Sequence, residues 1–275
     1  VIPRVRKIIE DVKRRGDQAL IDYTQQFDGV KLSRQKLRVS RAEVREAYKK
    51  VERGVVAALR QAALAIKRFH MKQMPRDWIE EISPGIKAGQ VFRALSSVGI
   101  YVPGGLARYP SSLLMAAIPA RVAGVKQLAV CTPPKKDGGI DPATLIAADM
   151  AKVDVIFRVG GAQAIAAMAY GTETVPRVDK IVGPGNIYVM AAKQVVSTEV
   201  NIDFPAGPSE VLILADGSAN PSFVAMDLIA QAEHDPAAAA VLVTTSETLA
   251  LKVRELVQVM LKESPRKNIA AKALG

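Results

Sequence analysis

The feature that most constrains the fold of this sequence is an alternation of short apolar segments with helical patterns, which begins near Ala94. The short segments are apolar on both faces, which is typical of buried parallel strands. Strands that alternate with helices along a chain indicate βαβ units. The sequence therefore predicts an α/β fold in which parallel sheets are flanked by helices.

The expected elements follow from this alternation. Strands are predicted at 97–102, 127–131, 153–159, 180–182, 211–215 and 240–243, and helices at 111–124, 141–153, 162–171, 186–198, 221–234 and 246–263. Helix 221–234 has the clearest boundaries. Asn220 is a favoured N-cap, and Pro221 suits the first helical position. Pro236 cannot continue a helix, so we expect the helix to end beside it.

The first 98 residues have a different, helical character. Apolar spacing predicts two amphipathic helices within 4–27, with a break near Gly16. Ser40 and Glu43 form a capping-box pattern that begins a further helical region, which runs with an interruption to about Met74. Prolines and glycines punctuate 75–90, which we interpret as loop or short strands.

The positive charge is concentrated in this first part. Lys and Arg outnumber Asp and Glu 22 to 11 over residues 1–94, whereas each pair totals 16 over residues 95–275. The basic residues are scattered through amphipathic patterns with few aromatic residues for base stacking, so we expect no nucleic-acid binding. A solvated helical face, or a surface that meets an acidic partner, explains the charge.

Length and cysteine content exclude other classes. A chain of 275 residues can bury a large core, and no apolar run approaches the ~18 residues of a membrane span. Cys131 is the one cysteine, which excludes an intrachain disulfide. We expect a cytoplasmic protein without a membrane segment. Because Cys131 lies in an apolar segment with no cationic neighbour, we interpret it as a buried structural thiol and not as a nucleophile.

Glycine-rich and proline-rich loops lie at the ends of four strands, at 101–105, 159–163, 182–186 and 205–210. Ligands of parallel sheets bind at the carboxyl ends of the strands, where glycine permits close approach and helix N-termini attract phosphate. None of the loops fits G-x-G-x-x-G or the P-loop spacing. The residues alone therefore predict a cleft for a small molecule or a nucleotide.

Several long motifs resemble the histidinol dehydrogenase family. They are VGIYVPGG, PARVAGV, VGGAQAIAAMAYGTETVPRVDKIVGPGN, DFPAGPSEVLILAD and DLIAQAEHD, and they occur in the family's order along essentially the whole chain. The resemblance implies two interleaved Rossmann-like units, with 1–98 a basic helical segment that joins the first unit, 99–208 the NAD-side unit, and 209–275 a return to the first unit. It also implies zinc- and NAD-dependent oxidation of L-histidinol, through histidinal, to L-histidine.

The resemblance also implies site residues. Tyr101, Gln163 and Asn186 match residues that contact NAD in the family, and Ser209 matches a residue that contacts the substrate. The family's enzymes are homodimers whose sites take residues from both subunits, and they act on a small amino alcohol.

Gln231 and His234 match two zinc ligands that also contact the substrate. Their separation of three positions places both in the last turn of the predicted helix 221–234, on one face, where they can meet one ion. Without the resemblance, a histidine in that turn is explained by the helix dipole alone. Asp227 lies one turn earlier but matches no family ligand, and we expect it to be solvated.

The chain departs from the family in length. The family's Glu-His catalytic pair and its further zinc ligands lie beyond the position that matches Gly275, so we expect an incomplete chain that is inactive by itself. Two alternatives stay open. The chain could be a paralogue that oxidises another polar alcohol, such as a sulfonated diol, or a non-catalytic binding or assembly protein with the same fold.

Overall fold

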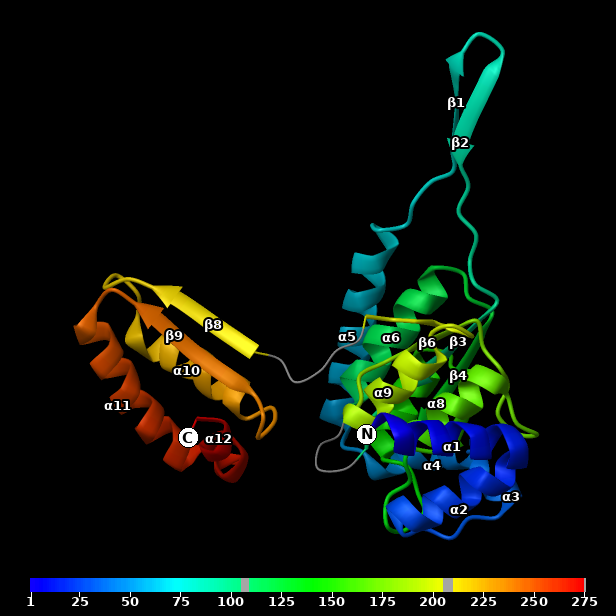
Figure 1. Cartoon of the computed structure of the whole chain (residues 1–275), viewed down its shortest axis with the longest axis horizontal. Helices are drawn as coiled ribbons and strands as arrows, with labels where there is room; N and C mark the ends of the chain where they lie inside the picture. The colour runs from blue at the N-terminus through cyan, green and yellow to red at the C-terminus, as the bar shows by residue number, and fades with distance from the viewer. Residues whose placement is uncertain (105–108, 205–209, 275) are drawn as a thin grey trace. The chain divides into compact units, whose positions relative to one another are not determined.

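The computed structural model describes residues 1–104, 109–204 and 210–274, and divides into a first unit, Val1–Pro205, and a second unit, Ala206–Gly275 (Figure 1). The helices of the first unit are α1 (Ile2–Arg15), α2 (Asp17–Asp28), α3 (Arg34–Leu37), α4 (Arg41–Lys50), α5 (Arg53–Met71), α6 (Pro110–Val122), α7 (Pro142–Met150), α8 (Gly161–Tyr170) and α9 (Ile187–Val196). Its strands are β1 (Trp78–Ser83), β2 (Ile86–Gln90), β3 (Ser97–Tyr101), β4 (Gln127–Thr132), β5 (Val155–Arg158), β6 (Lys180–Val182) and β7 (Asn201–Ile202).

A parallel sheet in the order β5-β4-β3-β6-β7 forms the centre of the first unit. Successive residues of its strands point to opposite faces, so that Ile100 and Val130 pack on one side whereas Tyr101 and Cys131 pack on the other. The apolar residues of these strands are therefore buried on both faces of the sheet. The predicted class, a parallel sheet flanked by helices, is confirmed.

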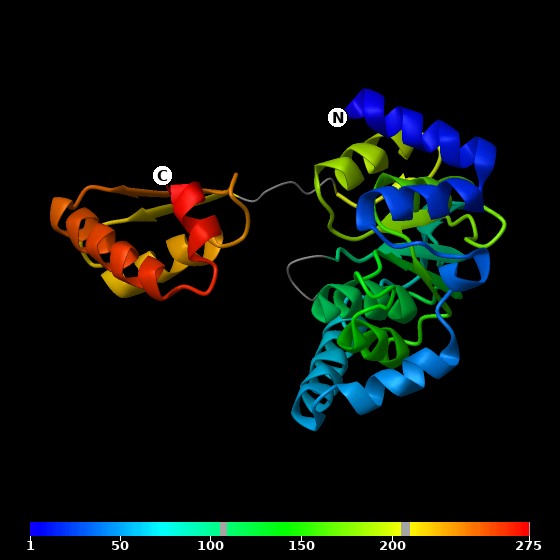
Figure 2. The ribbon, with the colours of Figure 1, turned by 90° about the horizontal axis from the view of Figure 1, so that it is seen from below.

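Two helical layers cover this sheet. Helices α1, α2, α8 and α9 pack together on one face, and α4, α5, α6 and α7 on the other. Figure 2 shows the blue and the cyan helices on opposite sides of the unit. The predicted break between the first two helices is at Gly16, and the capping box of Ser40 and Glu43 begins α4.

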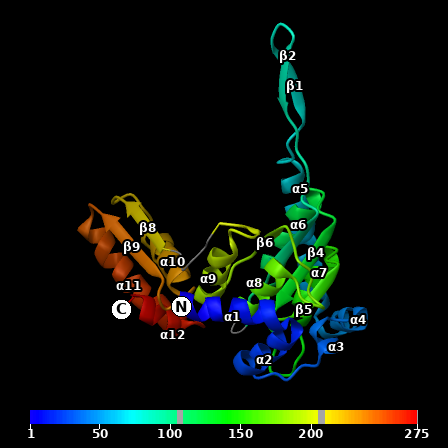
Figure 3. The same cartoon turned by 45° about the vertical axis from the view of Figure 1, so that its right-hand side comes forward.

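The segment 75–90 forms a hairpin of β1 and β2, which extends away from the helices and the central sheet of the first unit (Figures 1 and 3). Every residue of both strands is exposed. The short strand β7 was not predicted, because two residues carry too little pattern to separate a strand from a loop.

The second unit has its own small core. Its elements are β8 (Glu210–Ala215), α10 (Pro221–Ala232), β9 (Ala239–Thr244), α11 (Glu247–Glu263) and α12 (Lys267–Leu274). Strands β8 and β9 pair in parallel, and α10 and α11 pack against each other and against the strands. As predicted, Asn220 caps α10 and Pro221 begins it.

The predicted end of this helix is wrong. Helix α10 ends at Ala232, not at His234. The physical reason lies in the next residues, because a residue before a proline avoids helical geometry and the side chain of Asp235 accepts a hydrogen bond from the backbone N–H of Ala237. None of the described helices is long and apolar enough to cross a membrane.

Candidate functional site

A cavity of about 320 Å³ lies in the first unit beside Tyr101, the last residue of β3. The chain passes from β3 outward to β4 and β5, and then returns to β6 on the other side of β3. Such a reversal leaves a crevice between β3 and β6 at their carboxyl ends, which is where open parallel sheets bind ligands. The cavity is lined by Arg4, Ile8, Phe27, Asp28, Tyr101, Gly104, Pro133, Gly161, Ala162, Gln163, Asn186 and Tyr188.

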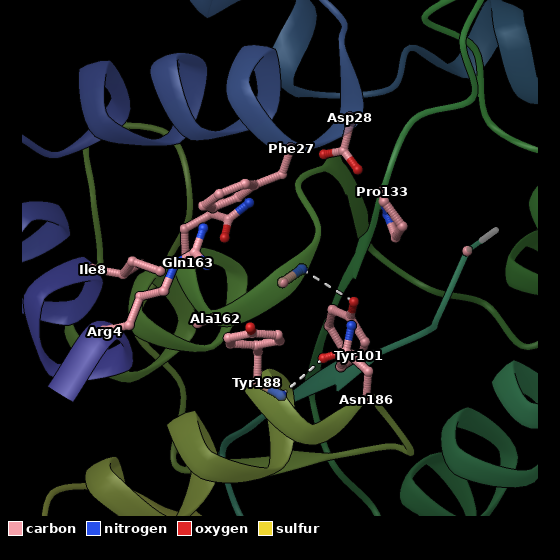
Figure 4. A pocket seen from close by; sticks show the side chains of 12 residues that line it. Arg4, Ile8, Phe27, Asp28, Tyr101, Pro133, Ala162, Gln163, Asn186 and Tyr188 are labelled. Atoms are coloured by element: carbon pink, nitrogen blue, oxygen red, sulfur yellow. Dashed lines mark hydrogen bonds between the residues drawn. The ribbon is translucent and has the colours of Figure 1, made fainter. Parts of the chain in front are cut away.

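The three residues that the sequence predicts at the cofactor, Tyr101, Gln163 and Asn186, all line this one cavity (Figure 4). They are brought together from the ends of β3, β5 and β6 by the parallel sheet. Of the predicted glycine loops, those around Gly104, Gly161 and Gly185 lie at this edge, whereas Gly105 and Gly207 lie outside the described residues. Cofactor contact by the three residues stays a prediction.

Tyr101 is almost completely buried, and its hydroxyl accepts a hydrogen bond of 3.1 Å from the backbone N–H of Gly161. Burial, aided by the nearby Asp28 carboxylate, raises the pKa of Tyr101 to about 12. The phenol therefore stays protonated at neutral pH. With its oxygen occupied by Gly161, it is suited to donate a hydrogen bond to a bound molecule.

Gln163 lies in the first turn of α8 and has no exposed surface. Both its side-chain nitrogen and its side-chain oxygen are buried without a hydrogen-bond partner among the described residues. A buried amide that makes no hydrogen bond costs stability, and such groups are rare in folded proteins. This orphaned amide therefore points to a ligand that offers one donor and one acceptor.

Asn186 caps α9. Its side-chain oxygen accepts hydrogen bonds from the backbone N–H groups of Tyr188 and Val189, at 3.0 and 3.1 Å. The side-chain oxygen is thus used in capping the helix, whereas the side-chain NH₂ group can still donate a hydrogen bond to a molecule in the cavity.

The loop 183–185, which precedes Asn186, is held in place by an ion pair between Lys193 and Asp203. The Lys193 ammonium donates to the carbonyl of Gly183 at 3.0 Å and pairs with the Asp203 carboxylate, which accepts a hydrogen bond of 2.7 Å from the N–H of Gly183. Gly183 has a φ of 118°, and a Cβ there would lie 2.0 Å from the carbonyl oxygen of Tyr101. Only glycine fits between the pair and β3.

Sequence reasoning did not identify the part of the cavity formed by the first two helices. Phe27 and Asp28 come from the end of α2, and the Arg4 guanidinium of α1 lies 5.6 Å from the ring centre of Phe27 and 5.7 Å from that of Tyr188. No local motif marks these residues, because α1 and α2 reach the sheet only through tertiary packing. Pro133 could have been found, since it follows β4 at the carboxyl edge.

The predicted metal ligands belong to the second unit. Gln231 lies in the last turn of α10, and His234 lies two residues after the helix, so the prediction that both belong to its final turn is wrong. The backbone N–H of His234 still donates to the carbonyl of Gln231 at 3.1 Å, which keeps them in consecutive positions of one turn. His234 is exposed, as is Asp227. Ser209 lies outside the described residues.

The chemistry of this pair fits part of a zinc site. Zinc accepts imidazole nitrogen, and oxygen donors can share its coordination sphere. Within 1–104, 109–204 and 210–274, however, no three His, Cys, Asp or Glu side chains are grouped as metal ligands. Gln231 and His234 therefore provide two donors, one fewer than catalytic zinc sites usually draw from protein.

The remaining candidates have structural roles. Cys131 is completely buried in β4, and burial raises the pKa of its thiol well above the usual range, so it stays protonated and unreactive. This agrees with the predicted structural thiol. His70 lies in α5 with its ring edge-on to Phe69, away from the residues that line the cavity.

Comparison with known proteins gives consistent matches. A family model described as histidinol dehydrogenase matches residues 1–275. The histidinol dehydrogenase of Methanothermobacter thermautotrophicus is 56% identical over 274 residues, which cover 100% of this chain and 64% of that protein. That of a Synechococcus strain is 51% identical over 271 residues, which cover 98% of this chain and 62% of that protein.

A solved structure agrees with these sequences. The crystal structure of histidinol dehydrogenase from Elizabethkingia anophelis matches with a TM-score of 0.94 at 44% identity, covering 99% of this chain and 63% of that one. The chain thus spans less than two thirds of the length of the relatives it matches.

Proposed function

Because the chain belongs to the histidinol dehydrogenase family, we propose that its protein oxidises L-histidinol, through histidinal, to L-histidine in histidine biosynthesis, with NAD as the oxidant. The observation that carries the proposal is the match to the family along all 275 residues. Since the relatives are longer than this chain, the complete activity is a property that we propose for the whole protein.

The cavity of the first unit supports NAD as the cofactor. When bound, NAD⁺ accepts the hydride that leaves the carbinol carbon. Tyr101 offers a protonated hydroxyl, Gln163 offers a buried donor and acceptor without protein partners, and Asn186 offers an amide NH₂. A volume of about 320 Å³ is at the lower end of the range for ligand pockets, which suits one half of a dinucleotide.

Gln231 and His234 support a zinc ion at the end of α10. When bound, zinc polarises the alcohol oxygen of the substrate. The exposed imidazole of His234 and the amide oxygen of Gln231 would hold the ion and orient the substrate, and Ser209 is proposed to contact the substrate. Since these two donors give an incomplete site, the remaining ligands are proposed to come from outside the described residues.

We propose a homodimer as the assembly. The hairpin of β1 and β2 supports it, because a two-stranded hairpin with no core of its own is only marginally stable in water. Ile79 and Ile82 are 68% and 63% exposed there, as expected of a surface that a second chain covers. Light scattering of the purified protein tests the assembly, and a monomer at micromolar concentration would contradict it.

The test of the proposed function is carried out on the protein expressed from its complete gene. We expect NADH to form when histidinol is added, with two NAD⁺ reduced for each histidine produced, and faster turnover with histidinol than with sulfonated diols. Turnover of a diol alone would favour a paralogue, and neither NAD binding nor turnover would favour a binding or assembly protein.

A substitution at the cavity sharpens this test. Gln163→Ala should weaken NAD⁺ binding by about tenfold, the effect of losing hydrogen bonds to a ligand. Its melting temperature should stay nearly unchanged, because the amide has no hydrogen-bond partner among the described residues. Gln61→Ala, an exposed glutamine of α5, is the matched control. Unaltered NAD⁺ affinity in the Gln163 variant would remove Gln163 from the cofactor site.

A further inference from the structure

Asp28 lines the cavity and has no structural explanation for its position. It is the last residue of α2, where the helix dipole disfavours a negative charge. Its Oδ2 atom is buried and has no hydrogen-bond partner among the described residues. A carboxylate held at a helix C-terminus without a partner costs stability, so its position is better explained by a ligand.

The position of this carboxylate is well defined. Gly29, which follows it, has a left-handed φ of 70°, and its N–H donates to the carbonyl of Gln25 at 3.2 Å, which fixes the end of α2. Asp28 lies close enough to the Tyr101 phenol to raise the pKa of that group. Figure 4 shows Asp28 among the residues around the cavity.

The charges around Asp28 restrict the ligand group that it meets. Among the described residues that line the cavity, Arg4 is the cation, and its guanidinium lies over the rings of Phe27 and Tyr188. Burial raises the pKa of Asp28 to about 6, so the group is still ionised at neutral pH and only accepts hydrogen bonds. A partner with two adjacent hydroxyl donors, as a ribose provides, satisfies both oxygens.

The side chains beside Asp28 indicate which of the two riboses of a dinucleotide it meets, the one attached to adenine or the one attached to nicotinamide. Tyr188 and the Arg4 guanidinium that lies over its ring both line the cavity and can stack on a base, whereas the Phe27 ring is already stacked on Tyr23. The oxidised nicotinamide ring is positively charged and would lie near the Arg4 guanidinium, whereas adenine is neutral. The adenosine half of the cofactor therefore fits the side of the cavity beside Asp28 better than the nicotinamide half does.

On the premise of the proposed function, we propose that Asp28 accepts hydrogen bonds from the adenosine ribose hydroxyls of NAD and excludes the 2′-phosphate of NADP. The carboxylate would lie against the phosphate dianion, and the two like charges repel each other in a half-buried site. Cofactor choice in this chain is thus set by the end of its second helix and not by a residue of the sheet.

Calorimetric titration of the protein with NAD⁺ and with NADP⁺ at pH 8 tests the proposal. We expect the unmodified protein to bind NAD⁺ more tightly than NADP⁺. Asp28→Asn should weaken NAD⁺ binding by about tenfold and tighten NADP⁺ binding by about tenfold, as expected for a charged hydrogen bond lost and a repulsion removed. Asp28→Ser should move both affinities in the same directions, and melting curves establish that both variants fold.

Asp22→Asn is the matched control. Asp22 is an exposed carboxylate of the same helix that pairs with Arg15 and does not line the cavity, so its variant should keep the preference for NAD⁺. If Asp28→Asn also keeps it, or weakens histidinol binding alone, Asp28 has no role in cofactor choice. If the unmodified protein binds neither dinucleotide, the proposed function itself fails.

Discussion

The two units of the chain place their candidate site residues in opposite ways. In the first unit, the cavity combines α1 and α2 with the ends of β3 and β6, which are far apart in sequence. In the second unit, Gln231 and His234 are three positions apart at the end of one helix. The first site exists only when the unit is folded, whereas the second is largely present in the local sequence.

This difference leads to different expectations for substitutions. In the first unit, Gly183 and Lys193 hold the loop beside the cavity, so a change of either should alter stability together with ligand binding. In the second unit, His234 is exposed, and its loss should alter metal binding alone. Substitutions of Gly183, Lys193, Asp28 and His234 test this contrast, with an expected change in the free energy of unfolding that decreases in that order.

Gly183→Ala should have the largest effect. The new Cβ would lie 2.0 Å from the Tyr101 carbonyl oxygen, and the φ of 118° is unfavourable for any other residue. Because the obstacle is backbone, the strand end must move, and we expect a loss of about 4 kcal/mol in the free energy of unfolding. Urea denaturation followed by circular dichroism measures this loss.

Gly29→Ala is the control for this prediction. Gly29 also has a positive φ, of 70°, but nothing lies within 4 Å of a Cβ there. Its substitution should cost only about 1 kcal/mol, the ordinary penalty of the left-handed conformation. Equal losses in the two variants would show that conformation, and not the close approach to β3, restricts Gly183.

Lys193→Met should have the next largest effect. It leaves the Asp203 carboxylate and the Gly183 carbonyl without their ammonium partner. Removing one member of a buried pair costs about 3 kcal/mol, and here somewhat less, because the Asp203 side chain is 32% exposed and can be hydrated. NAD⁺ binding should weaken as well, since the loop leads to Asn186.

Lys49→Met is the matched control for Lys193. Lys49 pairs with Glu46 at 2.9 Å, but its side chain is 77% exposed. Exposed pairs contribute little, so this change should stay within about 0.5 kcal/mol. If Lys193→Met cost as little, the buried pair would not hold the glycine loop.

Much of this fold could be predicted from local pattern. The strands from β3 to β6 carry apolar residues on both faces, and Asn220 with Pro221 marks the start of α10. The hairpin β1–β2 could not be predicted with the same rules, because its residues are all exposed and no burial pattern follows from them.

The candidate site was predictable to a smaller extent. Tyr101, Gln163 and Asn186 lie where parallel strands end, so topology and family resemblance both lead to them. Asp28 could not be found in this way, because the packing of α2 against α8 depends on many apolar contacts that no single motif records. The end of α10 was misplaced because the turn that the Asp235 side chain closes with the N–H of Ala237 leaves no sequence motif strong enough to mark the last helical residue.

Asp28→Asn should increase stability, by a smaller amount. The folded pKa of about 6 exceeds the ordinary value of 3.8, so the folded state holds its proton more tightly than the unfolded state. Stability therefore falls as the pH rises from about 4 to about 6, and the loss is complete above that range. Asparagine does not ionise and so avoids this loss of stability. Since Asp28 is only half-buried, we expect the variant to gain about 1 kcal/mol in the free energy of unfolding at pH 8.

The pH dependence identifies the origin of this gain. Unfolding at pH 8 and at pH 4 should show the advantage of the Asp28→Asn variant disappearing at the lower pH, where the wild-type carboxyl is protonated in the folded state. A variant that is equally stabilised at both pH values would show that burial of the charge is not the cause. A destabilised variant would show that the carboxylate has a partner in the protein.

His234→Ala should have the smallest effect on stability, within about 0.5 kcal/mol, because the side chain is exposed and lies beyond the end of α10. The substitution should instead lower the amount of zinc that the protein binds. A polypeptide of residues 1–275 offers zinc Gln231 and His234, and catalytic zinc usually has three protein ligands. We therefore expect less than one zinc per chain after dialysis, no histidinol oxidation, and a further loss of zinc in the variant. Stoichiometric zinc with NADH formation from residues 1–275, or zinc retained without His234, would show that other donors of this chain hold the ion, and the contrast between the two units would then be lost.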